Sequence, residues 1–417
     1  MTSEVVRDYD IIVAGGGMIG TCLALALAPL HLRVAVVEAV QRNASDQPSF
    51  DDRSTALSRS TQRMFEAMGL WPDVIAASTP IHRIHISDRG RFGFSHIDAA
   101  QQNVEALGYV VINRVLGDVL QSRLDEVQHL DWISPASIVA LERSDAHQTV
   151  TVEQDRQHNA MTCRLLVAAD GANSKVRDMI GISATRVAYD QMAIIGNLLP
   201  ERPLQNIAYE RFTASGPLAL LPIADNRAAF VWTQPADKVD ELLALDDNDF
   251  TERLQDAFGG RLGKFSKIGR RAAYPLALSK ANGLVGHRGV LVGNAAHGLH
   301  PVAAQGFNLG LRDVAALCDC LFDEQQARAG ATELFDPGNR AVLDAYADWR
   351  RPDQDKLVQF TDGLVRLFGS SRKSVAALRN IGMLGFDLIP GVRSLFARHT
   401  MGLAGRLPRL SRGVPLE

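Results

Sequence analysis

The first 38 residues constrain the fold of this chain more than any other stretch. An apolar run, Tyr9 to Ala14, has the pattern of a buried strand, and Gly15-Gly-Gly-Met-Ile-Gly20 follows it at once. Helical periodicity then covers residues 23–28, and a second apolar run, 34–37, ends on Glu38. This order of elements is typical of the unit that binds the adenosine end of a dinucleotide: a strand, a Gly-x-Gly-x-x-Gly turn, a helix, a second strand and an acid. The sequence therefore predicts an open α/β sheet that binds a dinucleotide.

Each small or acidic residue of this unit has a predicted role. Gly15 makes the tight turn, and Gly17 lets the pyrophosphate approach backbone N–H groups. Gly20 allows close packing of the helix on the strand, and Glu38 accepts hydrogen bonds from the ribose. NAD and FAD share this adenosine end, so the unit does not distinguish them. A glycine-rich turn without a ligand is the structural alternative.

A second glycine-rich stretch runs from Gly293 to Asp313. It follows a short apolar run, 289–292, and ends in a helical pattern. Pro301 stiffens the loop, and Gly306 lets backbone approach a ligand closely. The helix that follows would direct its unpaired N–H groups and the positive end of its dipole at that ligand. This arrangement suits a flat, electron-rich ligand that becomes anionic.

A third candidate feature is an acid at the end of a buried strand. Residues 164–169 have strand character and stop at Asp170-Gly171, after which a helix is expected. The Asp170 carboxylate would lie at the carboxyl edge of the sheet, where open α/β sheets bind ligands. As a purely structural residue, Asp170 would be the N-cap of that helix. Arg53, in the polar stretch 50–58, suits a pyrophosphate or a substrate anion, and a surface salt bridge explains it as well.

The second half of the chain has a different periodicity. From about residue 183 to 282 the pattern alternates every two residues, with one helix predicted over Phe250 to Phe258. We expect an inserted antiparallel sheet whose apolar face covers a large apolar substrate, although an ordinary sheet core accounts for the same residues. Beyond Arg340 we expect two helices, separated by a break at Arg350-Arg-Pro352.

Composition narrows the class of protein. The chain has 417 residues, and 44 Lys and Arg against 47 Asp and Glu give no global reason to bind nucleic acid. Its four cysteines are sparse and lack Cys-x-x-Cys spacing, which is typical of a reducing compartment. The sequence shows no apolar signal region and no run of about 18 apolar residues. We therefore expect a cytoplasmic protein.

The C-terminal segment predicts a peripheral contact with the inner face of a membrane. Residues 388–415 contain no acid and carry five arginines among apolar residues. A basic amphipathic tail suits a membrane surface or a groove in a partner protein. A C-terminal helix packed on its own domain is the alternative.

The three motifs, in this order, carry a resemblance to a known family. They are Gly15–Gly20 with Glu38, Asp170-Gly171 with Arg177, and Gly293-Asn-Ala-Ala-His297 with Pro301 and Gln305-Gly306. The chain resembles the single-component flavin-dependent aromatic hydroxylases of the para-hydroxybenzoate hydroxylase-like class. Within that class it is most similar to the ubiquinone-biosynthesis hydroxylases, and among these to the 2-octaprenyl-6-methoxyphenol hydroxylase branch. The stretches that carry this closer similarity are 50–58, 85–90, 209–213, 216–222, 257–264, 271–278 and 299–313.

The resemblance implies a fold and a division into domains. The implied fold is α/β and para-hydroxybenzoate hydroxylase-like: a Rossmann-type FAD domain, an inserted antiparallel β-sheet substrate domain and a C-terminal helical segment. The FAD-binding domain is discontinuous and comprises residues 1–80, 101–182 and 284–340. The substrate domain comprises residues 81–100 and 183–283, and the helical segment comprises residues 341–417.

The resemblance also implies which residues hold FAD, from the ADP moiety through the phosphates and the ribityl chain to the flavin ring. They are Gly15, Gly17, Gly20, Glu38, Arg53, Arg114, Asp170, Gly293, Asn294, Gly306, Phe307 and Asn308. The family normally has Gly-Asp where this chain has Gly293-Asn294. Because Asn keeps an acceptor and adds a donor, we expect FAD to bind with a different charge near the ribityl chain.

The activity implied is hydroxylation of the aromatic ring of a polyprenylated phenol in ubiquinone biosynthesis, by O2 through a C4a-hydroperoxide of the reduced flavin. NAD(P)H would be a transient electron donor, with an external reductase as the alternative, and other ubiquinone-biosynthesis proteins would be partners. No residue is predicted to be a general base. No metal site is expected at His297 and His300, because no further ligands cluster with them in the sequence. Either histidine could line the active site, with packing of the loop as the alternative. Two other functions stay open: the same chemistry on a small soluble phenol, and a non-catalytic FAD-fold subunit that binds lipid or acts as a scaffold.

Overall fold

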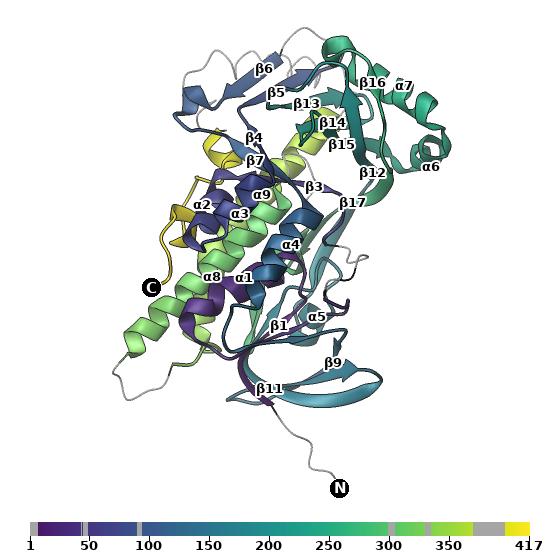
Figure 1. Cartoon of the computed structure of the whole chain (residues 1–417). Coiled ribbons are helices and arrows are strands. Elements are labelled where there is room, and N and C mark those ends of the chain that lie inside the picture. The colour runs from purple at the N-terminus through teal and green to yellow at the C-terminus, as the bar shows by residue number, and fades with distance from the viewer. Residues whose placement is uncertain are drawn as a thin grey trace.

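The computed structural model describes residues 7–42, 44, 49–89, 94–298, 305–329, 335–369 and 397–417. Two large β-sheets with helices between them build this part of the chain (Figure 1). The N-terminal sheet lies in the lower half of Figure 1 and the second sheet in the upper half. Two long strands, β12 (Ala184–Pro200) and β17 (Ala272–Ala281), pair with each other and run between the two halves. Residues 299–304, which include His300 and Pro301 of the second glycine-rich stretch, lie outside the described residues.

The first sheet is mostly parallel, in the order β18-β19-β11-β1-β2-β8, with β10 and β9 added beside β11. Its centre carries apolar residues on both faces, and Ile11, Ile12 and Val13 have no exposed surface. Helices must therefore cover both faces. The strands are β1 (Arg7–Ala14), β2 (Val34–Val37), β8 (Leu130–Ile133), β9 (Ser137–Arg143), β10 (Gln148–Gln154), β11 (Gln157–Ala168), β18 (Val285–Gly286) and β19 (Gly289–Leu291).

Besides the C-terminal helix introduced below, six helices in the described part of the chain accompany this sheet. Among them α1 and α8 pack against each other, and residues of both belong to the large core around the sheet. The α1 side chains are apolar almost all round, as expected of a helix with little solvent contact. The six are α1 (Met18–Leu27), α2 (Arg59–Ala67), α3 (Trp71–Ala76), α4 (Asn113–Leu124), α5 (Lys175–Ile180) and α8 (Gly306–Arg328).

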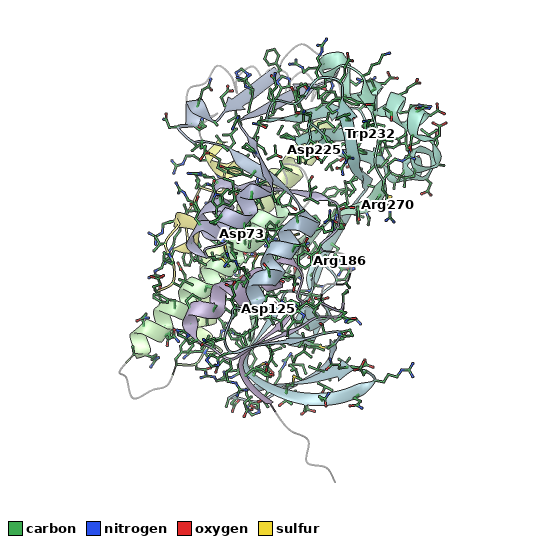
Figure 2. All side chains as sticks on the ribbon, in the orientation of Figure 1. Asp73, Asp125, Arg186, Asp225, Trp232 and Arg270 are labelled. Atoms are coloured by element: carbon green, nitrogen blue, oxygen red, sulfur yellow. The ribbon has the colours of Figure 1, made fainter. Side chains whose placement is uncertain are left out.

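The second sheet has nine strands, in the order β20-β17-β12-β15-β14-β13-β5-β6, with β16 beside β12. All its pairs are antiparallel except β5 with β13. Trp232, labelled in the upper part of Figure 2, is one of the aromatic residues buried on its helix-covered face. The remaining strands are β5 (Arg83–Asp88), β6 (Phe94–Asp98), β13 (Ile207–Thr213), β14 (Gly216–Pro222), β15 (Ala228–Pro235), β16 (Phe265–Ser266) and β20 (His297–Gly298).

Two helices cover that face, where the sequence predicts one. The predicted helix is α7 (Asp247–Phe258), and α6 (Ala236–Ala244) precedes it. Of the α6 residues only Val239 is buried, so the apolar period that identifies a helix is weak there. The chain turns between the two helices at Asp246, whose carboxylate caps α7 by accepting from the Asp249 N–H at 2.9 Å.

A small third sheet lies under the opposite face of the second sheet. It consists of β3 (Ser54–Ser58), β7 (Gly108–Ile112) and β4 (Ser78–Ile81), in the order β3-β7-β4. A core that we call the intersheet core joins it to the second sheet. Its buried members include Ile97, Val110, Ala208, Ala229 and Met401, and Ala56, Ile84 and Leu221 pack against it. The second sheet thus has helices on one face and the rest of the molecule on the other.

The predicted break at Pro352 is wrong, because α9 (Arg340–Gly369) runs straight through it. A proline inside a helix costs about 3 kcal/mol, since it removes one backbone hydrogen bond and crowds the preceding turn. Arg350 and Gln354, on either side of Pro352, both donate to the buried Asp313 carboxylate, at 2.8 and 2.9 Å. Hydrogen bonds to a charged group stabilise by roughly 1.5–3 kcal/mol each, which is enough to offset the proline.

The described part of the C-terminal tail packs on the molecule itself, which is the alternative to a membrane contact. Arg409 pairs with Asp323 at 2.7 Å, and the Arg406 guanidinium lies 4.0 Å from the ring centroid of Trp349. Leu416 is buried in the core of the first sheet. Residues 388–396, on which the amphipathic prediction also depends, lie outside the described residues.

Within the described ranges no helix combines the length and the apolar character that crossing a membrane requires. The predicted domain boundaries remain a proposal. The one at residue 183 precedes β12 by one residue, and the one at 283 follows the end of β17 by two. One short strand, β20, pairs with β17 of the second sheet although it belongs to a segment assigned to the FAD domain.

Candidate functional site

The glycine turn after β1 packs backbone directly on backbone. Gly15 has a φ of +98°, and a Cβ there would lie 2.7 Å from the Ala169 carbonyl oxygen. A Cβ at residue 20 would lie 1.8 Å from the Gly15 carbonyl oxygen, so only glycine lets α1 start this close to the turn. Gly17 is the N-cap of α1 and supplies no side chain to its first N–H groups. Those donors are therefore left to water or to a ligand.

Glu38 lies at the end of β2 and holds the turn in place. One carboxylate oxygen accepts from the Gly16 N–H at 2.5 Å, and the other accepts from the Val40 N–H at 2.9 Å. The side chain is almost fully buried. Carboxylate oxygens can each accept more than one hydrogen bond, so an acid at this place suits the hydroxyl groups of a ribose.

Two loops leave the carboxyl edge of the first sheet side by side. Ala168 of β11 and Leu291 of β19 are paired in parallel register. The Asp170 loop and the Gly293 loop follow these paired residues directly. The sheet therefore brings together two motifs that are more than a hundred residues apart in the sequence.

Arg177 ties these two loops to each other. Its buried guanidinium donates to the carbonyl oxygens of Ala172 at 3.2 Å and Ala295 at 3.1 Å. Arg186, labelled in Figure 2, comes from β12 and donates to the same Ala172 oxygen at 3.0 Å. The Asp170 loop at the carboxyl edge of the first sheet is thus bound by Arg177, which follows that sheet's strand β11, and by Arg186 of the second sheet.

The structural role predicted for Asp170 is wrong in detail. Ser174 is the N-cap of α5, and its hydroxyl accepts from the Arg177 N–H at 2.9 Å. The Ser174 hydroxyl in turn donates to Asp170 at 2.5 Å, and Asp170 also accepts from the Val176 N–H at 3.3 Å. Three residues separate Asp170 from the cap, so it orients the capping serine instead of capping the helix itself.

A buried carboxylate organises the second glycine-rich stretch. Asp313 has no exposed surface, and one of its oxygens accepts from the Gly293 N–H at 3.1 Å and from His297 Nε2 at 2.6 Å. Its other oxygen accepts from Arg350 and Gln354 of α9. Burial alone would raise the pKa of Asp313, but His297 and Arg350 hold it at about 2. The carboxylate therefore stays ionised in the folded protein.

Arg350 is itself buried and extends this network. Its guanidinium pairs with Asp353 at 2.5 Å as well as with Asp313. Asp353 also pairs with Arg312 at 2.8 Å. A buried ion pair stabilises only when its members remain together, because removing one partner leaves an uncompensated charge. We call the set Gly293, His297, Asp313, Arg350 and Gln354 the Asp313 network.

The first turn of α8 lies beside this network. A Cβ at Gly306 would meet no described atom within 4 Å, whereas a Cβ at Gly310, one turn later, would lie 2.7 Å from Ile19. Among the described residues, the start of the helix is therefore open and its next turn is closely packed. Phe307 is half-buried and packs against the core of the first sheet.

Asn308 ties the start of α8 to the third sheet through its side chain. Its Oδ1 accepts from the Ser58 N–H at 2.8 Å and from the Thr61 hydroxyl at 2.7 Å. Its Nδ2 donates to the Ala56 carbonyl oxygen at 2.9 Å. These three contacts from one amide fix the helix start relative to β3.

Arg53 and Arg114 lie in one loop region but are already paired with acids. Arg53 contacts Asp51 at 2.6 Å and lies 4.7 Å from the ring centroid of Tyr274 in the second sheet. Arg114 contacts Asp52 at 3.3 Å and is largely exposed. Both pairs are accessible to solvent, so their net stabilisation is small and a phosphate could compete for either guanidinium.

Asn294 is exposed at the sheet edge, next to the buried Gly293. In the described part of the chain no group of three or more His, Cys, Asp or Glu side chains could hold a metal ion. His297 lies inside the Asp313 network, as loop packing predicts, and His300 is outside the described residues. Sequence patterns did not predict that Arg350 and Gln354 bind Asp313, because a contact between α8 and α9 leaves no local pattern in the chain.

Comparison with known proteins supports the same cofactor. Residues 8–361 match the family described as FAD binding domain. The ubiquinone hydroxylase UbiL of Rhodospirillum rubrum is 38% identical over 419 residues, which cover 100% of this chain and 95% of that protein. The 3-demethoxyubiquinol 3-hydroxylase of Escherichia coli K12 is 30% identical and is covered over 99% of its length, against 95% of this chain.

Among solved structures, p-nitrophenol 4-monooxygenase PnpA from Pseudomonas putida DLL-E4 has the same fold. The two superpose with a TM-score of 0.78 over 96% of this chain and 100% of that one, at 18% sequence identity. At this identity the likeness concerns the fold alone. The two-sheet fold of this chain is thus shared with that monooxygenase.

Proposed function

The chain belongs to the FAD-binding family that includes the ubiquinone hydroxylases, and from this premise we propose that it hydroxylates the aromatic ring of a polyprenylated phenol in ubiquinone biosynthesis. The predicted para-hydroxybenzoate hydroxylase-like α/β fold, the FAD cofactor and the class of aromatic monooxygenase are confirmed. When bound, FAD supplies the activation of O2 that hydroxylation needs. NAD(P)H acts as a transient electron donor, since the sequence contains no second Gly-x-Gly-x-x-Gly unit.

The described residues fit a dinucleotide that lies along the carboxyl edge of the first sheet. The close packing at Gly15 and Gly20 and the open space at Gly306 match the two ends of such a ligand. In this proposal the ADP end is held by Gly15, Gly17, Gly20 and Glu38, and the phosphates by Arg53, Arg114 and Asp170. The ribityl chain meets Gly293 and Asn294, and the flavin ring lies against the backbone of Gly306, Phe307 and Asn308.

One observation carries the assignment of chemistry. No described residue lies close to a Cβ at Gly306 in the first turn of α8, and Asn308 ties this turn to β3, which borders the intersheet core. The positive end of a long helix stabilises an anion there by roughly 0.3–1 kcal/mol. A ring that becomes anionic on reduction would therefore lie between the dinucleotide sheet and the apolar face of the second sheet. The protein would exclude water from this place, which protects reactive oxygen chemistry.

The intersheet core also supports a lipid substrate. Ala208, Leu221 and Ala229 present small or apolar side chains on the face of the second sheet that is turned toward the third sheet. Such a surface suits an isoprenoid chain, which has no polar group to satisfy. We further propose that the protein meets this substrate at the inner face of the membrane, together with other proteins of the pathway. The exposed Arg398 and Arg412 of the tail lie in an acid-free stretch that suits an anionic surface.

The substrate class is tested by comparing kcat/KM for a prenylated phenol with that for the same phenol without its prenyl group. The proposal predicts a preference of about 10²-fold or more for the prenylated compound, because each buried CH₂ contributes about 0.8 kcal/mol. Equal kcat/KM values would favour a small soluble phenol. Purified protein that is colourless and binds no added FAD would instead favour a non-catalytic subunit.

A further inference from the structure

Glu210 places a carboxyl group on the face of the second sheet that is turned toward the small third sheet. It belongs to β13, where successive side chains point to opposite faces. Its neighbour Tyr209 packs edge-on against Phe258 of α7, with ring centroids 5.6 Å apart, so Tyr209 points to the helix-covered face. Ala208, which shares a face with Glu210, lies in the intersheet core. The Glu210 side chain therefore points toward the same side as that core.

The surroundings of Glu210 are apolar. Ile86 of β5 and Ala219 of β14 flank it directly, and Val231 of β15 follows Ala219 across the sheet. Glu210 is half-buried, and within the described chain no hydrogen bond or ion pair reaches its carboxyl group. A polar group without a partner in such a place destabilises the fold, so local structure gives no reason for an acid here.

This face of the sheet lies opposite the proposed flavin end. The intersheet core joins Ala208 of β13 to Val110 of β7, and Ala56 of β3 packs against it. The Ala56 carbonyl oxygen accepts from the Asn308 side chain at the start of α8. A phenol ring that lay over the first turn of α8 would thus meet the face of the second sheet that carries Glu210.

Burial raises the pKa of Glu210 from its ordinary value to about 7. No charged group among the described residues adds to this shift. Among the described side chains, the titratable groups on the neighbouring elements are Asp88 at the end of β5, Arg398 and His399 in the tail segment before Met401, and Asp355 and Lys356 of α9, which contacts β14. A group that titrates near neutral pH can exchange protons with a substrate under working conditions.

We propose that Glu210 is the general base that accepts the proton of the phenolic hydroxyl of the substrate. The O–H bond of the phenol breaks, its proton passes to the Glu210 carboxylate, and the electron pair stays on the phenolic oxygen. The ring carbon next to that oxygen becomes more nucleophilic and better able to attack an electrophilic oxygen. The inference rests on the proposed function, since it needs a phenol as substrate.

Turnover gives the first test, with three variants of the FAD-loaded enzyme. In the wild type, kcat/KM for a prenylated phenol should rise with pH to a plateau, with a midpoint at about 7. Glu210→Gln should lower kcat/KM on the plateau by about 10²-fold, through kcat more than KM, and move the rise to the pKa of the free phenol near ~10. Glu210→Asp, which keeps a carboxylate, should restore part of the rate and the lower midpoint. Glu241→Gln, which removes an exposed acid of α6, should match the wild type.

A second readout needs no turnover. Prenylated 4-nitrophenol changes its absorbance on ionisation and can be titrated while bound to the oxidised holoenzyme. In the wild type the carboxyl and the phenol should titrate as a coupled pair in two steps, because two adjacent negative charges oppose each other. In Glu210→Gln only one step should remain, with the visible spectrum of bound FAD unchanged as proof of folding.

The outcomes separate the two proposals. A wild-type enzyme that neither hydroxylates nor binds the prenylated phenol would overturn the proposed function and the role of Glu210 with it. A wild-type enzyme that hydroxylates the phenol, with a Glu210→Gln variant that has the same pH profile and the same two-step titration, would overturn only the role of Glu210.

Discussion

The backbone N–H of Gly293 donates a 3.1 Å hydrogen bond to the carboxylate of Asp313, twenty residues later in the chain. This bond closes the second glycine-rich stretch on itself, because β19 delivers Gly293 to the sheet edge and α8 carries Asp313. Arg350 and Gln354 fix the same carboxylate from α9. The buried Asp313 carboxylate thus fixes the position of the first turn of α8. We propose that the flavin ring lies at this turn.

Replacing that charge should destabilise the protein and loosen FAD. Asp313→Asn keeps the shape but leaves Arg350 buried beside an uncharged amide, and breaking a buried ion pair typically costs about 3–5 kcal/mol. Urea unfolding of the purified protein would show the loss, and released FAD would show in its fluorescence. Asp344→Asn removes a partner of the exposed Arg340 and should cost less than about 1 kcal/mol. Equal stability of the two variants would contradict the role given to the Asp313 network.

Low pH should remove the stability that the ionised Asp313 carboxylate contributes in the wild type. The pKa of Asp313 is about 2 in the folded protein, below its value near ~4 in an unfolded chain. A depressed folded pKa stabilises above the unfolded value, and this stability is lost as the pH falls through the folded value. The contribution, about 2 kcal/mol, should therefore disappear between about pH 4 and pH 2. Asp313→Asn should show a smaller loss of stability over this window than the wild type, as measured by urea midpoints at each pH.

The open space at Gly306 predicts a variant that separates folding from cofactor binding. Gly306→Ala should leave the unfolding free energy unchanged or raise it by up to about 1 kcal/mol, because alanine favours a helix over glycine. FAD affinity should fall by about tenfold or more, since the new methyl group would occupy space proposed for the flavin ring. Gly260→Ala, at an equally open glycine in the second domain, should change neither quantity. Wild-type FAD affinity in Gly306→Ala would mean that the ring lies elsewhere.

Asn294 departs from the family pattern, and restoring the acid tests the ribityl assignment. An ionised acceptor binds a hydroxyl by roughly 1 kcal/mol more than an amide does, so Asn294→Asp should tighten FAD binding by about fivefold. Asn226→Asp makes the same change in an exposed turn of the second sheet, next to the Asp225 labelled in Figure 2, and should leave FAD affinity as it is. If both variants bind FAD like the wild type, Asn294 does not contact the ribityl chain.

Local patterns predicted the parts of the site that local geometry builds. The Gly15–Gly20 turn, the strand before it and the acid Glu38 follow from contacts within a few dozen residues, and the structure brings Glu38 onto the Gly16 N–H. The neighbourhood of Asp170 and Gly293 also follows, because the carboxyl ends of parallel strands meet at one edge. For these residues the type of side chain and the strand and helix pattern around it both predict a position at the carboxyl edge of the first sheet.

Tertiary contacts determine the features that the local sequence patterns did not predict. Pro352 predicts a helix break, yet contacts of Arg350 and Gln354 with Asp313 keep α9 continuous. Glu210 interrupts no pattern in the sequence, since an acid in an alternating strand is ordinarily placed on the solvent side. Only the packing of Tyr209 against α7 shows that Glu210 points toward the third sheet. Neither the continuity of α9 nor the direction of the Glu210 side chain can be inferred from the residues next to it in the sequence.

The most direct test of the central claim is a single assay on the purified protein. Its visible spectrum is recorded first, and NADPH oxidation is then followed in air with and without a prenylated phenol, with analysis of the product. We expect a bound flavin spectrum, NADPH oxidation that the phenol stimulates, and a product with one added ring hydroxyl per NADPH consumed. A protein that binds flavin but yields no hydroxylated product with any prenylated phenol, whether NADPH or an added reductase supplies the electrons, would contradict this expectation.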